Sequence, residues 1–454
     1  MKVRVMKKKN MRCGMIATFL ALSVVWPLCG QGQTVQILGA DRLELKGLLS
    51  AAQAVQIGLR ENLMARAARS DIDTAAAETR IARSQMRPQM SANTYLALGD
   101  ANNILYTAGN VMPQNYLSVP SQGFADQNVT LMVPLYTSGR LENAVRAASQ
   151  RERAVISDAG GVQADIALRI KEAYYHVLLA AEIINTAQGR VEASAELVKN
   201  MQALFTAGKG LESSVRRVEA EQADAQRALT TARNTSAKAM LDLKAAMGIR
   251  LDSSITLNDA LTFAPLTGDL RVQMTDAAKL RPELQAARAR ALAARAQTRS
   301  MRGAQGPQVA GMAMADGFTS HPQGTREGYT VGVVLSLPLI DGGQRRAETA
   351  QARARQERAE SETRDLELRV SVEVQQAWLD ASTAAENYRA AQSALQAAQS
   401  AYDVTALRVQ NQKGLLVEQL DALASLTQAR GNVAQALYDH SLAAARLQRA
   451  VGRP

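Results

Sequence analysis

The most promising chemical groups in the sequence are two carboxylates, Glu418 and Asp421, which lie three residues apart in a proline-free stretch. On a helix this spacing places both side chains on one face. Carboxylates in a narrow passage attract cations and form a barrier to anions. The same two residues also suit an ordinary solvated helix start, where acids complement the helix dipole. Both interpretations remain open at the level of sequence.

Groups that would indicate an enzyme or a metal site are few. The three histidines, His176, His321 and His440, are isolated from cysteines and from one another, and both cysteines, Cys13 and Cys29, lie near the N-terminus. No HExxH, GxSxG or P-loop pattern occurs. His176 and His440 fall within long helical patterns, which favours packing roles. We therefore expect no enzyme, and no catalytic, cofactor-binding or metal-binding residues.

Composition and charge narrow the remaining classes of function. The 454 residues carry a formal net charge of +11, and only 4% of them are aromatic. Six lysines and arginines precede the first apolar run with no acid among them, so the rest of the chain carries +5. Arginine-rich stretches such as residues 288–299 alternate with alanine, which is typical of a solvated helix face. We expect no nucleic-acid partner.

Residues 1–32 have the pattern of a secretory signal peptide: a basic start, a short apolar run from Met15 to Leu28, and small residues after it. The run is shorter than the roughly 20 residues of a membrane-spanning helix, although an anchor is the alternative. Cys29 is a candidate lipid attachment site, but bulky residues precede it. Residues 33–48 form an N-terminal extension. No later apolar run approaches a helical span, so any membrane span is expected to be β-structure.

The elements that would position the two acids occur twice in the chain. The segment LMVPLYTSG (residues 131–139) returns as LSLPLIDGG (residues 335–343), and this shift of 204 residues holds without a gap from Leu131 to Gly248. In the part of each copy that precedes this segment, up to Pro88 and Pro307, the shift is 219 residues. Chance similarity between alanine-rich helices would not keep prolines and glycines in phase. The sequence therefore predicts a duplication, with copies at 49–248 and 274–454 joined by a linker at 249–273.

Each copy has the same predicted order of elements. An opening helix (49–86 or 274–301) ends at a proline, two strands follow, and a long helical hairpin completes the copy. An ordinary soluble β-hairpin is the alternative for the strands. The strands are predicted at 89–98 and 127–136 in the first copy and at 308–318 and 329–340 in the second. The hairpins are predicted at 139–248 and 343–451. The strand-to-helix turns are predicted at Pro134 and Gly139 and, in the second copy, at Pro338 and Gly343.

In each hairpin one glycine-bearing turn reverses the chain. The turn is at the end of the hairpin that lies away from the strands. The turns read FTAGKGL in the first copy and QKG in the second. On the returning helix of the second copy, apolar residues recur at three-, four- and seven-residue steps, as in a coiled-coil seam. The turn residues of interest are Phe205, Gly208, Gly210 and Leu211, then Gln412 and Gly414.

With these elements in place, the sequence resembles the TolC-like outer-membrane efflux protein family. The resemblance rests on LSAAQAVQIGLREN (residues 49–62), AAKLRPEL (277–284), the paired VPLYTSG and LPLIDGG, FTAG, and the helix ends LKAAMG and LQRAVG. Val409 and Gln412 depart from it, since similar proteins usually carry an aromatic residue and a glycine there.

The resemblance implies a mostly α fold with membrane β-structure. Three chains with four strands each would build a 12-stranded barrel in the outer membrane, continuing into a helical barrel of antiparallel coiled-coil hairpins in the periplasm. It further implies the duct of a tripartite efflux or type I secretion system, which exports together with a periplasmic adaptor and an inner-membrane pump of the RND, ABC or MFS type. The turns would dock the adaptor, and Glu418 and Asp421 would form a ring of six carboxylates that narrows the closed tip.

A secreted periplasmic coiled-coil structural or adaptor protein that never enters a membrane is the alternative. The strand pairs favour the export duct, because an adaptor hairpin needs no β segments before each long helix. Neither the exported substrate nor the class of pump follows from the sequence.

Overall fold

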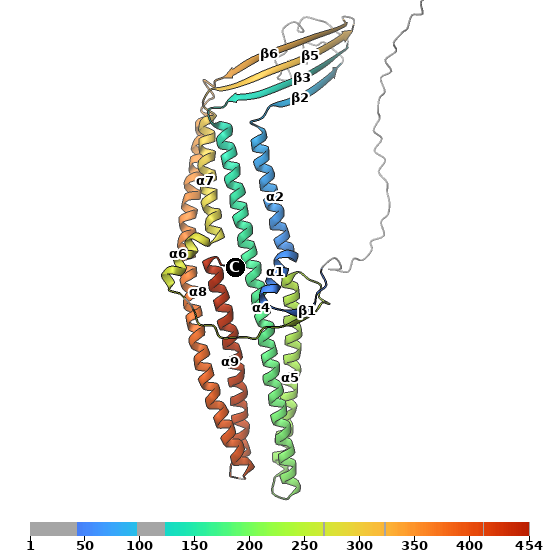
Figure 1. The fold of residues 1–454 in the computed structure, drawn as a ribbon, viewed down its shortest axis with the longest axis vertical. Helices are drawn as coiled ribbons and strands as arrows, with labels where there is room; N and C mark the ends of the chain where they lie inside the picture. Colours follow the sequence, from blue (N-terminus) through green and yellow to red (C-terminus); the bar gives the residue numbers. More distant parts are fainter. Residues whose placement is uncertain (1–42, 98–122, 267, 322–323, 412, 454) are drawn as a thin grey trace, which may run out of the picture. The chain divides into compact units, whose positions relative to one another are not determined.

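The computed structural model describes residues 43–97, 123–266, 268–321, 324–411 and 413–453, all within one structural unit spanning residues 41–454 (Figure 1). The predicted signal peptide, including Cys29, lies outside the described residues. In chain order the elements are β1 (Lys46–Leu49), α1 (Ala51–Glu61), α2 (Leu63–Ser84), β2 (Gln89–Ala97), β3 (Gly123–Tyr136), α4 (Arg140–Thr206), α5 (Glu212–Met247), β4 (Ser254–Leu257), α6 (Leu270–Leu280), α7 (Pro282–Gly303), β5 (Gln308–His321), β6 (Gly324–Ser336), α8 (Gln344–Gln410) and α9 (Leu416–Val451).

Each helix of the first copy has a counterpart of identical length in the second. Helices α1 and α6 have 11 residues, and α2 and α7 have 22. The long helices α4 and α8 have 67 residues each, and the returning helices α5 and α9 have 36. The two halves of the chain therefore share one order of elements, as a duplication would produce.

The four long strands form one antiparallel sheet in the order β2-β3-β5-β6. In the first copy Gln89 of β2 lies opposite Met132 of β3. Shifting these residues by 219 and 204 gives Gln308 and Ser336, which are paired in β5 and β6. The two shifts read from the sequence therefore reproduce the register of the second strand pair.

The boundaries of three strands differ from the sequence prediction. Strand β3 begins at Gly123 instead of residue 127, and β5 continues to His321 instead of ending at 318. Strand β6 covers Gly324–Ser336 instead of 329–340. It ends at Ser336 because that residue lies opposite Gln308, the first residue of β5, so the following residues have no strand to pair with. Residue 98, predicted to end the first strand, lies outside the described residues.

The opening helix of each copy is broken once, which the sequence analysis did not predict. The breaks are at Asn62 and Arg281, both extended, with ψ of 131° and 120°. Arg281 precedes Pro282, and a residue before proline is disfavoured in the helical conformation. Asn62 lacks that constraint, and its side chain instead caps α2 by accepting a hydrogen bond from the Met64 N–H at 2.8 Å. The second opening helix also starts at Leu270, four residues earlier than predicted.

The hairpins pack α4 along α5 and α8 along α9 (Figure 1). A 67-residue helix is roughly 100 Å long at 1.5 Å per residue. Where α1, α4 and α5 meet, the core contains Ile170, Tyr174 and Leu243, all fully buried. The Tyr174 hydroxyl hydrogen-bonds the Leu49 carbonyl at 3.0 Å. None of the helices in the described part of the chain is both long and apolar enough to cross a membrane.

Candidate functional site

The turn between α4 and α5 is a tight reversal built on two glycines. The Lys209 N–H donates to the Leu204 carbonyl at 2.9 Å, and Gly208 has a φ of +71°, which a residue with a side chain rarely adopts. A Cβ on Gly210 would lie 3.0 Å from the backbone nitrogen of Phe205. Phe205 and Leu211 are nevertheless exposed, at 47% and 71%. The turn thus presents two large apolar side chains on a tight, hydrogen-bonded backbone.

The turn between α8 and α9 repeats this arrangement. The Lys413 N–H donates to the Arg408 carbonyl at 2.8 Å, and a Cβ on Gly414 would lie 2.9 Å from the Arg408 Cβ. Leu415, the counterpart of Leu211, is 67% exposed. Gln412 lies outside the described residues. The sequence therefore located both reversals, and the close approach of Gly210 and Gly414 to the preceding helix end explains the need for glycine.

The two hairpins meet just before their turns. Leu197 and Met201 of α4, Val215 and Val218 of α5 and Leu423 of α9 form a buried apolar cluster. Beside it lies a cavity of about 440 Å³ lined mainly by residues 193–204 of α4 and 402–410 of α8. The turns are thus carried on a packed base that joins both copies of the repeat.

Glu418 and Asp421 lie at the start of α9, and both are exposed. The Glu418 carboxylate accepts a hydrogen bond from the Leu415 N–H at 3.4 Å, which is the bond expected of a helix start. The first-copy counterparts are Ser214 and Arg217, so only the second hairpin carries acids at these positions. The ring of carboxylates therefore stays a prediction.

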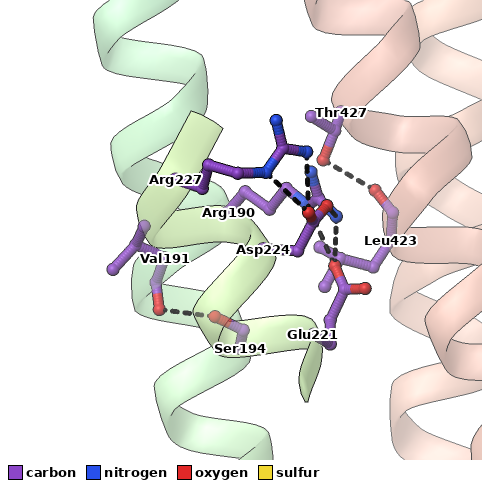
Figure 2. A network of polar contacts seen from close by, with 8 residues as sticks. All are labelled: Arg190, Val191, Ser194, Glu221, Asp224, Arg227, Leu423 and Thr427. Carbon is purple, nitrogen blue, oxygen red and sulfur yellow. Dashed lines mark hydrogen bonds and ion pairs between the residues drawn. The ribbon is translucent and has the colours of Figure 1, made fainter. Parts of the chain in front are cut away.

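A charged clamp near the first turn was not predicted from the sequence. Figure 2 shows Arg190 of α4 reaching Glu221 and Asp224 of α5, at 2.5 and 3.4 Å. Arg227 also binds Asp224, at 2.7 Å, and its hydrogen bond holds the pKa of that carboxyl below its usual value. The counterparts of Arg190, Glu221 and Asp224 in the second hairpin are alanine, serine and glutamine. This charged clamp therefore has no counterpart at the same positions of the second hairpin.

The helix breaks at Asn62 and Arg281 are tied to the ends of the hairpins by equivalent contacts. The Asn62 amide donates to the Ala246 carbonyl at 2.9 Å, and the buried Arg281 guanidinium donates to the Ala450 carbonyl at 3.2 Å. Shifts of 219 and 204 residues relate these contacts. Arg281 in addition pairs with Glu373 of α8 at 2.7 Å. The second junction is thus the more charged of the two.

Glu283 extends this junction toward the first copy. It accepts hydrogen bonds from Arg281 and Arg449, and Arg449 also pairs with Asp165 of α4 at 2.7 Å. Burial has the largest single effect and raises the pKa of Glu283. The hydrogen bond from Arg449, a backbone hydrogen bond and the charges of Arg449 and Arg281 together outweigh it, so the net pKa is below its usual value. The network binds α4, α7 and α9 together, so the two copies are joined by charge as well as by packing.

The strand-to-helix turns bring both copies close together beneath the sheet. Gly139 and Gly343 precede α4 and α8 with φ of +79° and +90°. Pro134 lies within β3 at a register irregularity, whereas Pro338 lies beyond the end of β6. The Ser138 hydroxyl donates to the Pro307 carbonyl at 2.6 Å. These turns set where each long helix leaves the sheet.

The histidines with described side chains make packing contacts. His440 is 1% exposed, and its ring lies 4.6 Å from that of Phe263, which in turn stacks on Tyr388. Burial lowers the pKa of His440. His176 lies 6.1 Å from the ring of Tyr438. Within the described ranges, no three His, Cys, Asp or Glu residues form a group that could hold a metal ion.

Comparison with known proteins places this architecture in a family. The model of the family described as "Outer membrane efflux protein" matches residues 54–249 and 274–453. The chain belongs to the outer membrane efflux protein family. Its two matched regions correspond to the two copies of the repeat, and the resemblance noted in the sequence is confirmed.

One curated protein and several solved structures are similar to this chain. The alkaline protease secretion protein AprF of Pseudomonas aeruginosa is 25% identical over 291 residues, which is 63% of this chain and 60% of AprF. The outer-membrane channel OprN matches with a TM-score of 0.75 and 20% identity, covering 89% of this chain and 90% of OprN. The outer membrane protein VceC of Vibrio cholerae matches with a TM-score of 0.72 and 17% identity, covering 89% and 96%. The predicted fold class, mostly α with a β part, is therefore confirmed.

Proposed function

We propose that three copies of this outer membrane efflux family member form a duct through the outer membrane, with most of its mass in the periplasm. The duct passively exports substrates delivered by an inner-membrane pump of the RND, ABC or MFS type through a periplasmic adaptor. Its sheet closes into a barrel in lipid, and its helical hairpins continue the passage toward the pump.

The observation that carries this proposal is the sheet with two open edges. In the described part of the chain, β2 and β6 have no strand on their outer sides. Val333 and Leu335 of β6 are exposed at 68% and 67%, and Leu96 of β2 at 76%. In lipid, each unpaired backbone group would cost several kcal/mol, and membrane barrels start at about 8 strands. Four strands per chain therefore call for several copies, and the family resemblance favours three.

The exposed apolar side chains of the turns support docking of the adaptor at the tips. Phe205, Leu211 and Leu415 lie at the ends of the hairpins farthest from the sheet and are about half or more exposed. The buried cluster behind them holds the turns in place, so these side chains present a preformed apolar surface. A partner that covers them needs little reorganisation of this chain.

We expect the protein to resist carbonate extraction from membranes and to have three times the mass of the chain when solubilised in detergent. The reason is that only closure between copies pairs the edges of β2 and β6. Fractionation followed by light scattering, corrected for bound detergent, measures both properties. Release by carbonate would favour a secreted coiled-coil protein, and a stable monomer in detergent would contradict the duct.

Replacing Glu418 and Asp421 by asparagine should lower the preference of single channels for cations in planar bilayers. Three copies bring six carboxylates to one level of the passage, where like charges repel anions and concentrate cations. Block by multivalent cations should weaken in the same variant. Glu212 and Glu219, exposed or half-buried acids of the other hairpin that pair with Arg216, give a matched control double variant. Unchanged selectivity after loss of Glu418 and Asp421 would exclude the ring.

A further inference from the structure

The four-stranded sheet has two chemically different faces. Residues directly opposite each other in antiparallel strands lie on the same face, and successive residues of a strand alternate between the faces. By this rule one face is mainly apolar and includes Leu96, Val129, Val331 and Leu335, whereas the other is mainly polar and includes Asn93, Asn128, Asp316 and Thr330. In membrane β-structure an apolar face contacts lipid and a polar face lines the passage.

Three methionines lie together on the polar face. Met132 of β3 is directly opposite Met312 of β5, and Met314 follows two residues later on the same strand, opposite Thr130. Met132 is 46% exposed, and the other two are half-buried. Methionine commonly fills gaps in an apolar core. These three lie outside the helix core and on the face opposite the apolar one, so that role does not account for them.

The register brings the three side chains within reach of one another. Directly opposite residues have Cα atoms about 4.5–5.5 Å apart, and diagonal neighbours about 7–8 Å apart. Because the methionine side chain has three rotatable bonds, the three sulfur atoms can turn toward one point. Gly332 of β6 lies opposite Met312, and a Cβ there would meet no atom within 4 Å. The neighbouring strand therefore leaves open space beside Met312.

The internal repeat shows that the strands themselves do not require methionine at these positions. Under the shifts of 204 and 219 residues, the equivalents of the three methionines are Ser336, Asn93 and Tyr95. All three equivalents have polar groups, as suits the polar face. The methionines are therefore a feature of the β3–β5 pair, and each chain has one such group.

We propose that Met132, Met312 and Met314, here called the thioether cluster, bind a soft monovalent metal cation, Cu(I). Thioether sulfurs are soft donors that select Cu(I), whereas Mg²⁺ and Ca²⁺ prefer oxygen ligands. By register, the nearest acidic or basic residue on this face of the described strands is Asp316, two residues beyond Met314, and its carboxylate favours a cation nearby. The place of the cluster on the passage wall rests on the proposed duct, but binding needs only one chain.

The spacing of histidines and cysteines, from which the sequence analysis expected no metal site, does not detect this cluster. Met312 and Met314 form a short Met-Ala-Met motif, but Met132 lies far away in the first copy of the repeat. Only the pairing of β3 with β5 brings the third sulfur to the other two. The site therefore depends on the topology of the sheet.

Titration with Cu(I) tests the thioether cluster in the full-length protein purified in detergent. Cys13 and Cys29 are first changed to serine, because thiolates bind Cu(I) themselves; ascorbate keeps the copper reduced, and the chelator bicinchoninate sets its free concentration. The variant M132L/M312L/M314L keeps the volume and apolar character of the side chains but lacks their sulfurs. We expect one Cu(I) per chain in the parent protein and at least tenfold weaker binding in this variant. Affinity within twofold of the parent would show that these sulfurs are not the ligands.

The variant M64L/M86L/M90L is the matched control. It also removes three methionines, which are exposed at 62%, 41% and 75%. Met90 lies opposite Leu131 on the apolar face, and neither Met64 nor Met86 belongs to a strand, so the sheet does not bring these sulfurs together. This variant should bind Cu(I) as tightly as the parent. An equal loss in both triple variants would overturn the site, because it would indicate binding by exposed methionines in general.

The chemistry of the ligands is read from X-ray absorption at the copper edge. Copper bound to the parent protein should have sulfur neighbours, and Ag(I), which is also soft, should displace it, whereas Zn(II) at the same concentration should not. A shell of nitrogen and oxygen atoms alone, or displacement by Zn(II), would contradict thioether ligation.

Bilayer recordings of the same preparations separate this inference from the proposed function. The site variant M132L/M312L/M314L should conduct ions as the parent does, because leucine changes neither the charge nor the bulk of the sheet face. If the parent conducts ions but the titration finds no Cu(I) site, the duct stands and this inference fails. If the parent binds Cu(I) through sulfur but conducts no ions, the site stands and the duct fails.

Discussion

Inserting a bulky charged pair, Arg-Glu, after Gly208 should abolish export without reducing the amount of assembled oligomer. The insertion falls in an exposed reversal beyond the buried cluster that includes Leu197 and Val215, so the hairpin base keeps its packing. It nevertheless moves Phe205 and Leu211 apart and places charges on the apolar surface proposed for the adaptor. A deletion strain complemented with this variant should be as sensitive to pump substrates as the uncomplemented strain, a change of tenfold or more.

A Gly-Ser insertion after Gly208 is the matched control for this experiment. It lengthens the turn equally but adds neither charge nor bulk, and it should retain most export activity. Immunoblots of solubilised membranes report the amount of oligomer for both variants. Export at the wild-type level with the charged insertion would count against docking at the tips.

Gly303→Val should prevent most of the protein from assembling. A Cβ on Gly303 would lie 2.7 Å from the Ser138 carbonyl oxygen and 2.8 Å from the Arg140 nitrogen, both backbone atoms. A backbone cannot move aside as a flexible side chain can, so the cost should reach or exceed the roughly 1–3 kcal/mol usual for overpacking. The clash falls where α7 meets the start of α4, beneath the sheet. We expect the yield of oligomer to fall at least tenfold.

Gly431→Ala serves as the control substitution for this prediction. Gly431 lies within α9, and no atom lies within 4 Å of the position its Cβ would take. Alanine there should be neutral or stabilise the helix by about 0.5–1 kcal/mol. Wild-type yield of oligomer for Gly303→Val, measured beside this control, would show that α7 can move away from α4 at little cost.

Features set by local backbone chemistry could be predicted from the sequence. Prolines and glycines kept in phase over shifts of 204 and 219 residues revealed the repeat, since such residues mark turns and helix ends directly. Glycine is required at positions 210 and 414 because each of these residues packs closely against the end of the preceding helix. Once the structure gives the register of β2 and β3, the same shifts also give the register of β5 and β6.

Features set by contacts between distant residues could not be predicted. Arg190 and Glu221 are 31 positions apart on two helices, and no local pattern identifies them as partners. Strand β6 ends at Ser336 because its neighbour begins at Gln308, a limit that lies in the other strand. No proline follows Asn62 to indicate the helix break there. Its side chain caps α2 through the Met64 N–H, but nothing in the sequence distinguishes this asparagine from one without a capping role. The ion pair, the end of β6 and the helix break all depend on contacts in the folded chain that the local sequence does not reveal.

The most direct test of the central claim, that copies of this chain form a passage through the outer membrane, is the wild-type recording in planar bilayers. Purified oligomer should insert and produce discrete, uniform steps in conductance, with a preference for cations. A closed tip would keep the steps small, and the preference for cations should fall in the double variant that lacks Glu418 and Asp421. Oligomer that inserts into the bilayer but conducts no ions in either form would contradict the account.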